Sequence, residues 1–236
     1  MGQRVRLDPL GVALYLALGV LGGCRPVLSP VIPERATAVS VDSVAGWTAE
    51  TAPEGRILHR FKWLYRDDRS SVGGRGSARV AAPDSLRFDV AGPLGVNPAA
   101  AMVVGDTAIW IDAPESIRDI VPSYPLLWAG FGVIHPPDQA RVVWAGRAGA
   151  VVAWRLVAGA DTVEYALTRS VPRRLQAVVR RDGHTVARMD AEFTAEGRPA
   201  HARLDVPSRP ARLDLTFTLS DPSARFPADV WRPRHP

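Results

Sequence analysis

The sequence predicts a mainly β protein: a single strongly curved antiparallel sheet, or incomplete barrel, of about ten or eleven strands with short covering helices. Three observations predict it. Short segments between residues 56 and 220 alternate apolar and polar side chains, as strands with one wet face do. Hairpin-turn pairs such as Gly105-Asp106 and Asp182-Gly183 separate several of them. Only two segments have helical character, and both are short. A two-sheet sandwich is the alternative that the same pattern allows.

The first element is a short helix within residues 42–51, capped by Asp42 or Ser43, with Val44 and Trp47 on one face. A strand at residues 56–66 follows. Its odd-numbered positions form an apolar side that includes Phe61 and Trp63, whereas Arg60, Lys62 and Arg66 lie on the other side.

A central pair of strands, residues 77–81 and 85–91, is joined by a turn at Pro83-Asp84. In the second strand Leu86, Phe88 and Val90 alternate with Arg87, Asp89 and Ala91, which predicts a core face and a wet face. The glycine-rich residues 73–76 just before this pair are expected to form a flexible hairpin loop.

Pro93 and Gly95 end the strand at residues 85–91 and leave Leu94 at the tip of a loop. An apolar side chain at such a tip has two interpretations. It either folds back onto its own sheet or is presented to lipid, and the sequence leaves both open.

Further strands are expected at residues 99–104 and 107–112. Residues 126–131 form an apolar segment between prolines and predict a short buried helix. The remaining strands are expected at residues 141–145, 151–157, 163–168, 173–181, 185–194, 201–206 and 212–219, followed by a proline-rich tail.

Composition excludes several classes of function. Basic residues exceed acidic ones by 29 to 24, but they are scattered along the strands, so no nucleic-acid partner is expected. The five histidines show no metal-ligand spacing, and no catalytic or nucleotide-binding motif occurs. We therefore expect no enzyme activity, no metal and no cofactor. The seven tryptophans suit either a plain core or the lining of an apolar cavity.

The N-terminus carries two arginines, an apolar run from Leu10 to Gly22 that is short for a membrane span, and then Leu21-Gly22-Gly23-Cys24. This arrangement resembles a bacterial lipoprotein signal, which implies cleavage before Cys24 and lipid attachment to it. An uncleaved anchor, or an ordinary secretory signal with an unrelated cysteine, is the alternative. Arg25 follows the cysteine and not an aspartate, which points to the outer membrane of a two-membrane cell. The expected organisation is a signal peptide at 1–23, a tether at 24–41 and one domain at 42–236.

The chain resembles the LolA/LolB-like family of periplasmic lipoprotein carriers and outer-membrane lipoprotein receptors, and the receptor side fits better. Four features carry the resemblance: the lipidation signal, the hairpin leading to Gly92-Pro93-Leu94-Gly95, the proline-bounded segment Pro122–Trp128, and the second run of strands. The resemblance implies that Pro93, Leu94 and Gly95 form a membrane-insertion loop. The short initial helix and the proline-rich ends depart from the family.

A concave apolar face under only two short helices is expected to leave a cavity for acyl chains. The residues predicted to line it are Phe61, Trp63, Leu86, Phe88, Val90, Met102, Val104, Leu126, Leu127, Trp128, Phe131, Leu213, Leu215 and Phe217. The expected function is that of a monomeric, lipid-anchored protein on the periplasmic face of the outer membrane. It would bind lipid or acylated lipoprotein cargo, received from a periplasmic carrier protein, and insert it. The alternative is an accessory lipoprotein whose curved sheet binds a protein partner and whose interior is filled by its own side chains.

Overall fold

The computed structural model describes residues 31–112 and 122–233. The chain divides into two units, residues 1–30 and residues 31–236, and every described element belongs to the second unit. The expected signal peptide, Cys24 and the first part of the expected tether lie outside the described residues. The second unit has a hydrophobic core of its own, which joins both helices to the sheet.

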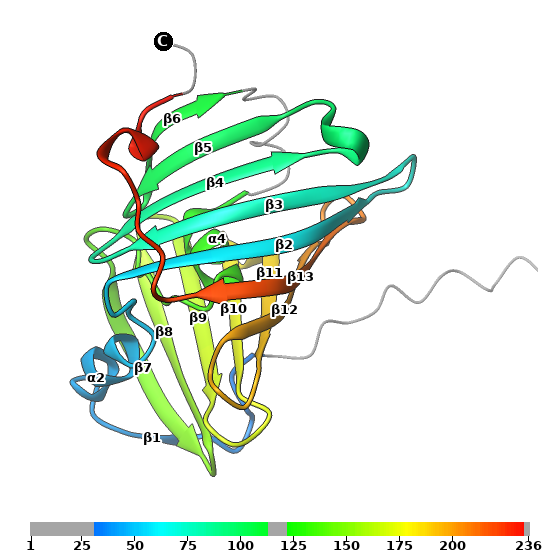
Figure 1. The fold of residues 1–236 in the computed structure, drawn as a ribbon. Helices are drawn as coiled ribbons and strands as arrows, with labels where there is room; N and C mark the ends of the chain where they lie inside the picture. Colours follow the sequence, from blue (N-terminus) through cyan, green and yellow to red (C-terminus); the bar gives the residue numbers. More distant parts are fainter. Residues whose placement is uncertain (1–30, 113–121, 234–236) are drawn as a thin grey trace, which may run out of the picture. The chain divides into compact units, whose positions relative to one another are not determined.

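Figure 1 labels the helices and strands in chain order. The strands are β1 (Thr37–Ala38), β2 (Arg56–Arg66), β3 (Ser71–Ala81), β4 (Ser85–Ala91), β5 (Ala99–Val104), β6 (Thr107–Asp112), β7 (Arg141–Ala148), β8 (Val151–Ala158), β9 (Asp161–Thr168), β10 (Arg174–Arg181), β11 (His184–Phe193), β12 (Pro199–Val206) and β13 (Ala211–Asp221). The helices are α2 (Ser43–Ala49) and α4 (Tyr124–Gly130), with 3₁₀ turns η2 (Pro93–Gly95) and η3 (Ala228–Trp231).

All the strands belong to one antiparallel sheet of 13 strands, in the order β1-β7-β8-β9-β10-β11-β12-β13-β2-β3-β4-β5-β6. This confirms a mainly β fold with a single antiparallel sheet, and the sandwich is wrong. Within the described residues the outermost strands, β1 and β6, do not pair with each other, so the sheet is not closed into a barrel. The sequence gives no sign of β1, a strand of 2 residues that pairs with β7.

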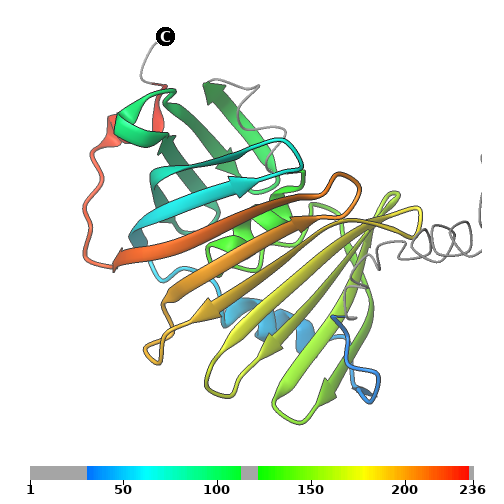
Figure 2. The same cartoon turned by 90° about the vertical axis from the view of Figure 1, so that its right-hand side faces the viewer.

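The sheet bends strongly along its length. Strands β2–β6 run at a steep angle to β7–β12, and α4 lies between the two groups (Figures 1 and 2). Helix α4 contacts β10, β11 and β12, and its residues from Pro125 to Gly130 are buried. Helix α2 packs beside β7 through Val44 and Trp47. Asp42 is its N-cap residue, but neither Asp42 nor Ser43 makes the expected side-chain cap.

Strand β3 begins six residues earlier than the sequence predicts, because Gly73, Gly74 and Gly76 belong to it and not to a loop. These glycines allow neighbouring groups to lie close to the β3 backbone. A Cβ atom on Gly76 would lie 2.5 Å from the ring of Phe61, and one on Gly74 would lie 1.9 Å from the carbonyl oxygen of Ala91. Glycine is therefore required here by packing, which a pattern of glycines read as flexible does not reveal.

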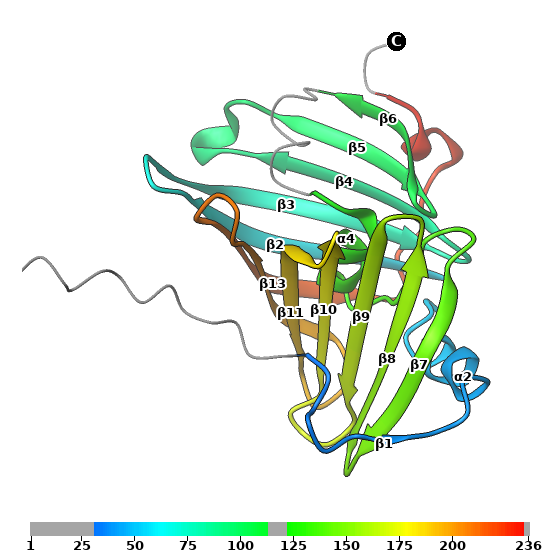
Figure 3. The same cartoon turned by 180° about the vertical axis from the view of Figure 1, so that it is seen from behind.

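The two faces of the sheet differ in chemistry. The face toward α2 and α4, called the inner face below, is apolar across nearly all strands. The opposite, outer face of β10–β13 is rich in cross-strand pairs of arginine with an acid, such as Arg203–Asp214, Arg212–Asp205 and Arg174–Glu192. Figure 3 shows these strands side by side from behind.

Candidate functional site: the inner face and its open end

The pairing register of the strands shows which of the predicted cavity residues lie on the inner face. Phe61 stands opposite Gly76 on one side and Phe217 on the other, and Gly76 stands opposite Val90. The strand residues that lie on this face are Phe61, Trp63, Leu86, Phe88, Val90, Leu213, Leu215 and Phe217. Leu126, Leu127 and Trp128 from α4, and Phe131 just after it, are buried in the same cluster.

The prediction that Met102 and Val104 line the cavity is wrong. They stand opposite Arg87 and Ser85, so they lie on the outer face, whereas Ala101 and Val103 take the inner positions. Residues 99–104 are apolar at every position, so alternation cannot decide which side chains point inward. Trp110 pairs with Met102 and shares its outer position, while Trp154 is inner and fully buried.

The inner face of β7–β11 is filled by the protein's own aromatic groups. The indole of Trp154 stacks on Tyr165 with ring centroids 5.4 Å apart, and Trp47 of α2 tilts against it at 5.6 Å. Trp128 of α4 donates to the carbonyl oxygen of Gly105 at 2.6 Å and stacks on His135. Trp47 thus ties α2 to β8, whereas Trp128 ties α4, which packs on β10–β12, to the turn between β5 and β6.

A second aromatic cluster lies where β13 and β2 meet. Phe61, Phe131 and Phe217 have ring centroids 5.8–6.0 Å apart, and His59 packs against two of them. Burial lowers the pKa of His59 to about 4, because the protonated ring would lose its hydration. The imidazole is therefore neutral at pH 7, and its Nδ1 shares a hydrogen bond of 2.9 Å with the Ser220 hydroxyl.

The inner face becomes accessible beyond this cluster. Trp63, Tyr65, Val90 and Leu213 pack on the core but are only half-buried; we call these four residues the mouth. Trp63 is oriented by hydrogen bonds of 3.2 Å from its indole nitrogen to the carbonyl oxygens of Arg75 and Ala91. Tyr65 stands opposite Leu213, so the four side chains span β4, β2 and β13. An apolar surface of this kind is suited to a hydrocarbon chain.

The loop after β4 lies beside the mouth, since Ala91 accepts the Trp63 bond and Leu94 follows three residues later. Leu94 is 104% exposed and has a φ of 58°, in the left-handed region that costs energy for a leucine. The interpretation in which Leu94 folds back onto its sheet is therefore wrong. Val96, at 54%, is a further exposed apolar side chain of this loop.

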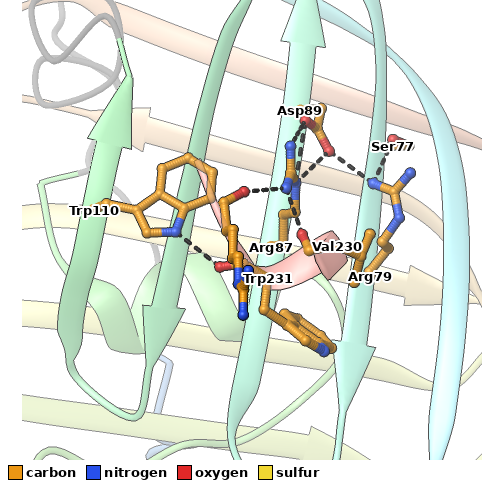
Figure 4. Close-up of polar contacts among 8 residues, drawn as sticks. Ser77, Arg79, Arg87, Asp89, Trp110, Val230 and Trp231 are labelled. Atoms are coloured by element: carbon orange, nitrogen blue, oxygen red, sulfur yellow. Dashed lines mark hydrogen bonds and ion pairs between the residues drawn. The ribbon is translucent and has the colours of Figure 1, made fainter. Parts of the chain in front are cut away.

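The outer face of β4 holds a polar cluster that the sequence analysis missed (Figure 4). Arg87 was expected on a wet face, but it is only 4% exposed because the C-terminal tail covers it. Its guanidinium donates to Asp89 at 2.8 Å and to the carbonyl oxygens of Val230 and Arg232. Trp110 supports the tail with a 3.0 Å bond to the carbonyl oxygen of Trp231. No local pattern signals a contact across more than 140 residues.

Other chemistry is sparse in the described part of the chain. No three His, Cys, Asp or Glu side chains there are grouped so that they could hold a metal ion. None of the helices in residues 31–112 and 122–233 combines the length and the apolar character needed to cross a membrane. A cleft of about 460 Å³ beside the start of α4 is mostly polar, with Asp106, Asp138 and Asp161 on its sides.

The comparison with solved structures found similar folds, whereas the two sequence comparisons found nothing. No family model matches the sequence, and no curated protein matches it either. A solved LolA superfamily protein of Nitrosomonas europaea is 12% identical, with a TM-score of 0.57, over 82% of this chain and 98% of its own. A solved domain of Vibrio parahaemolyticus, described as a putative outer membrane lipoprotein-sorting protein domain, is 7% identical, with a TM-score of 0.56, over 80% and 95%.

The likeness to these two solved structures is one of fold, which in this chain is an open, strongly bent antiparallel sheet with helices on its apolar inner face. The chain has a LolA/LolB-like fold, as the sequence motifs predicted.

Proposed function

We propose that this protein is a lipid-anchored envelope protein that takes the acyl chains of an amphiphile, or of a lipidated protein, onto its inner face through the mouth. The observation that supports it most directly is the mouth itself: four half-buried apolar side chains adjoin a filled core. A half-buried aromatic and aliphatic surface gains free energy when a hydrocarbon chain covers it.

The exposed Leu94 loop supports a delivery step. The side chain gains no contact within the protein and sits in a backbone conformation unfavourable to leucine, so stability does not explain it. Inserted at a bilayer interface, a leucine side chain contributes roughly 1.5–3 kcal/mol. We propose that Pro93, Leu94 and Gly95 insert into the membrane that receives the cargo.

Cys24 supplies the anchor in this proposal, and its signal favours the periplasmic face of the outer membrane. The cargo would arrive from a periplasmic carrier protein, and the receiving protein would act as a monomer without catalytic chemistry. The solved neighbours support this proposal only through their fold and the sorting role given in the description of one of them.

Uptake is tested with a fluorescent fatty acid and with native mass spectrometry of the chain from Arg25 onward. Leu213→Glu places a carboxylate in the mouth and should weaken uptake at least tenfold. Thr216→Glu adds the same charge to the exposed outer side of the same strand and should leave uptake unchanged. Equal affinity in both variants, or no bound acyl chain in the wild type, would refute lipid binding at the mouth.

Delivery is tested by loading the same chain and following release to liposomes. Leu94→Glu should keep the melting temperature within a few degrees and should bind amphiphile normally, because its side chain touches nothing in the protein. Release should slow about ten- to a hundredfold, as the lost interfacial burial predicts. Unchanged release with intact stability would exclude the loop from delivery.

A second candidate is an accessory lipoprotein that binds a protein partner. The observation in its favour is the inner face of β7–β11, which Trp47, Trp128 and Trp154 already fill. A wild-type protein that carries no lipid, yet is retained by a partner protein through its sheet, would favour this candidate.

A further inference from the structure

Three basic side chains gather on the outer face of β2 and β3 beside the Leu94 loop. Lys62 and Arg75 stand directly opposite each other, and Arg60 lies two residues from Lys62 on the same face. All three are exposed. Like charges directly opposite each other across two strands destabilise a sheet, so this arrangement does not exist for stability.

On the rest of the outer face, basic side chains are paired with acidic ones. There arginines are placed against acids, as in Arg203–Asp214, Arg212–Asp205 and Arg155–Glu164. Within the described residues Arg60, Lys62 and Arg75 form no ion pair with a carboxylate. Thr216 and Ser77, their neutral neighbours across the strands, cannot neutralise them.

Arg60 and Arg75 also line an open groove of about 390 Å³ on this outer face. Its floor includes Ser77, and Ala91 and Pro98 mark the two ends of the Leu94 loop. Acids lie toward its other side: Asp89, which is bound to Arg79 and Arg87, and Asp112 on the edge strand β6. Lys62 and Arg75 lie in the cross-strand row of Ala91, nearest the loop, whereas Arg60 lies one row further away, in line with Ser77 and Asp89.

We infer that Arg60, Lys62 and Arg75 bind the phosphate-bearing headgroups of an anionic phospholipid bilayer while Leu94 enters its apolar layer. This inference deepens the proposed delivery function and rests on it for the approach of the loop to a membrane. An exposed leucine and a cationic cluster separated by a few residues of loop supply the two attractions that peripheral membrane binding needs. The cluster would hold the Leu94 loop at the membrane surface and give the protein a preference for anionic lipid.

The test uses the chain from Arg25 onward, which contains the complete second unit, and flotation with vesicles. The vesicles consist of phosphatidylcholine alone or mixed with phosphatidylglycerol. Replacing Arg60, Lys62 and Arg75 with Gln should weaken binding to the anionic vesicles by about fivefold per charge, or about a hundredfold in all. Binding to phosphatidylcholine vesicles and fatty-acid uptake should not change.

A matched control removes three outer-face arginines that are paired with acids: Arg174, Arg203 and Arg212, each changed to Gln. It has the same net charge as the test variant and should lose only a few-fold in affinity. An equal loss in both variants would mean that overall charge and not this cluster decides binding, which would overturn the inference. So would competition by glycerol phosphate at millimolar concentration, since that would identify a site for a free phosphate.

The two proposals fail separately. If the inference is wrong and delivery is right, the wild type still takes up fatty acid and releases it in a Leu94-dependent way to phosphatidylcholine vesicles, without preference for anionic ones. If delivery is wrong, Leu94→Glu has no effect on release to either kind of vesicle.

Discussion

Replacing Arg87 with Ala should destabilise the protein far more than the replacement of any paired surface arginine. Its side chain is only 5% exposed and donates to Asp89 and to two carbonyl oxygens of the tail. The guanidinium also lies 5.2 Å from the ring centre of Trp110. Loss of this group removes the link between β4 and the C-terminal tail.

The magnitude follows from what is left unpaired. Removing one partner of a buried ion pair costs about 3–5 kcal/mol, because the other charge stays buried. Asp89 keeps Arg79 at 2.7 Å, so the loss should lie at the low end, about 3 kcal/mol. Arg203→Ala is the matched control: its side chain is 53% exposed, and its pair with Asp214 should contribute at most about 1 kcal/mol.

Urea unfolding of the chain from Arg25 onward measures both variants. Equal shifts of the unfolding midpoint for Arg87→Ala and Arg203→Ala would refute the buried role of Arg87. Deletion of residues 226–236 tests the mechanism, because it uncovers Arg87. The cost of Arg87→Ala should then fall by at least about 1 kcal/mol, as expected for groups in one network.

Three further outcomes are expected. Phe88→Asp should cost several kcal/mol, since it buries an unpaired charge on the inner face, and a shift of the melting temperature no larger than that of Ser77→Asp would contradict this position. Cys24→Ala should abolish metabolic labelling by a fatty-acid analogue, and equal labelling of both proteins would remove the lipoprotein interpretation. The pKa of His59 is about 4 in the folded protein and about 6.5 when unfolded, so its contribution of up to about 3 kcal/mol is complete above pH 6.5 and is lost as the pH falls toward 4. His59→Phe should flatten this part of the stability profile measured by urea unfolding, and an unchanged slope would show that other groups cause it.

The alternation of apolar and polar residues predicts the inner side chains correctly wherever one face of a strand is polar. Strands β12 and β13 and the inner residues Phe61, Phe88 and Leu215 were predicted from it, because each apolar side chain has a charged or hydroxyl neighbour. The same reasoning failed for Met102, where every neighbour is apolar.

Tertiary contacts explain the other failures. Arg87 has the pattern of a wet position, yet a segment more than 140 residues away covers it. The glycines of β3 have the pattern of a loop, yet the ring of Phe61 requires the space above Gly76. Neither contact is indicated by the residues next to Arg87 or Gly76 in the sequence, so only the folded structure reveals it.

The pairing of β2 with β13 determines when this protein can finish folding. Strand β2 is the first long strand to be made, but its neighbour arrives near the end of synthesis, with partners such as Arg66 and Asp214 separated by 148 residues. Until then β2 and β12 each expose a free edge, and the aromatic cluster around Phe61 lacks Phe217. Pairing across so long a chain closes slowly. A chain that ends before residue 211 therefore keeps the unpaired backbone edges of β2 and β12 and an incomplete hydrophobic core. Such truncated chains are prone to aggregate.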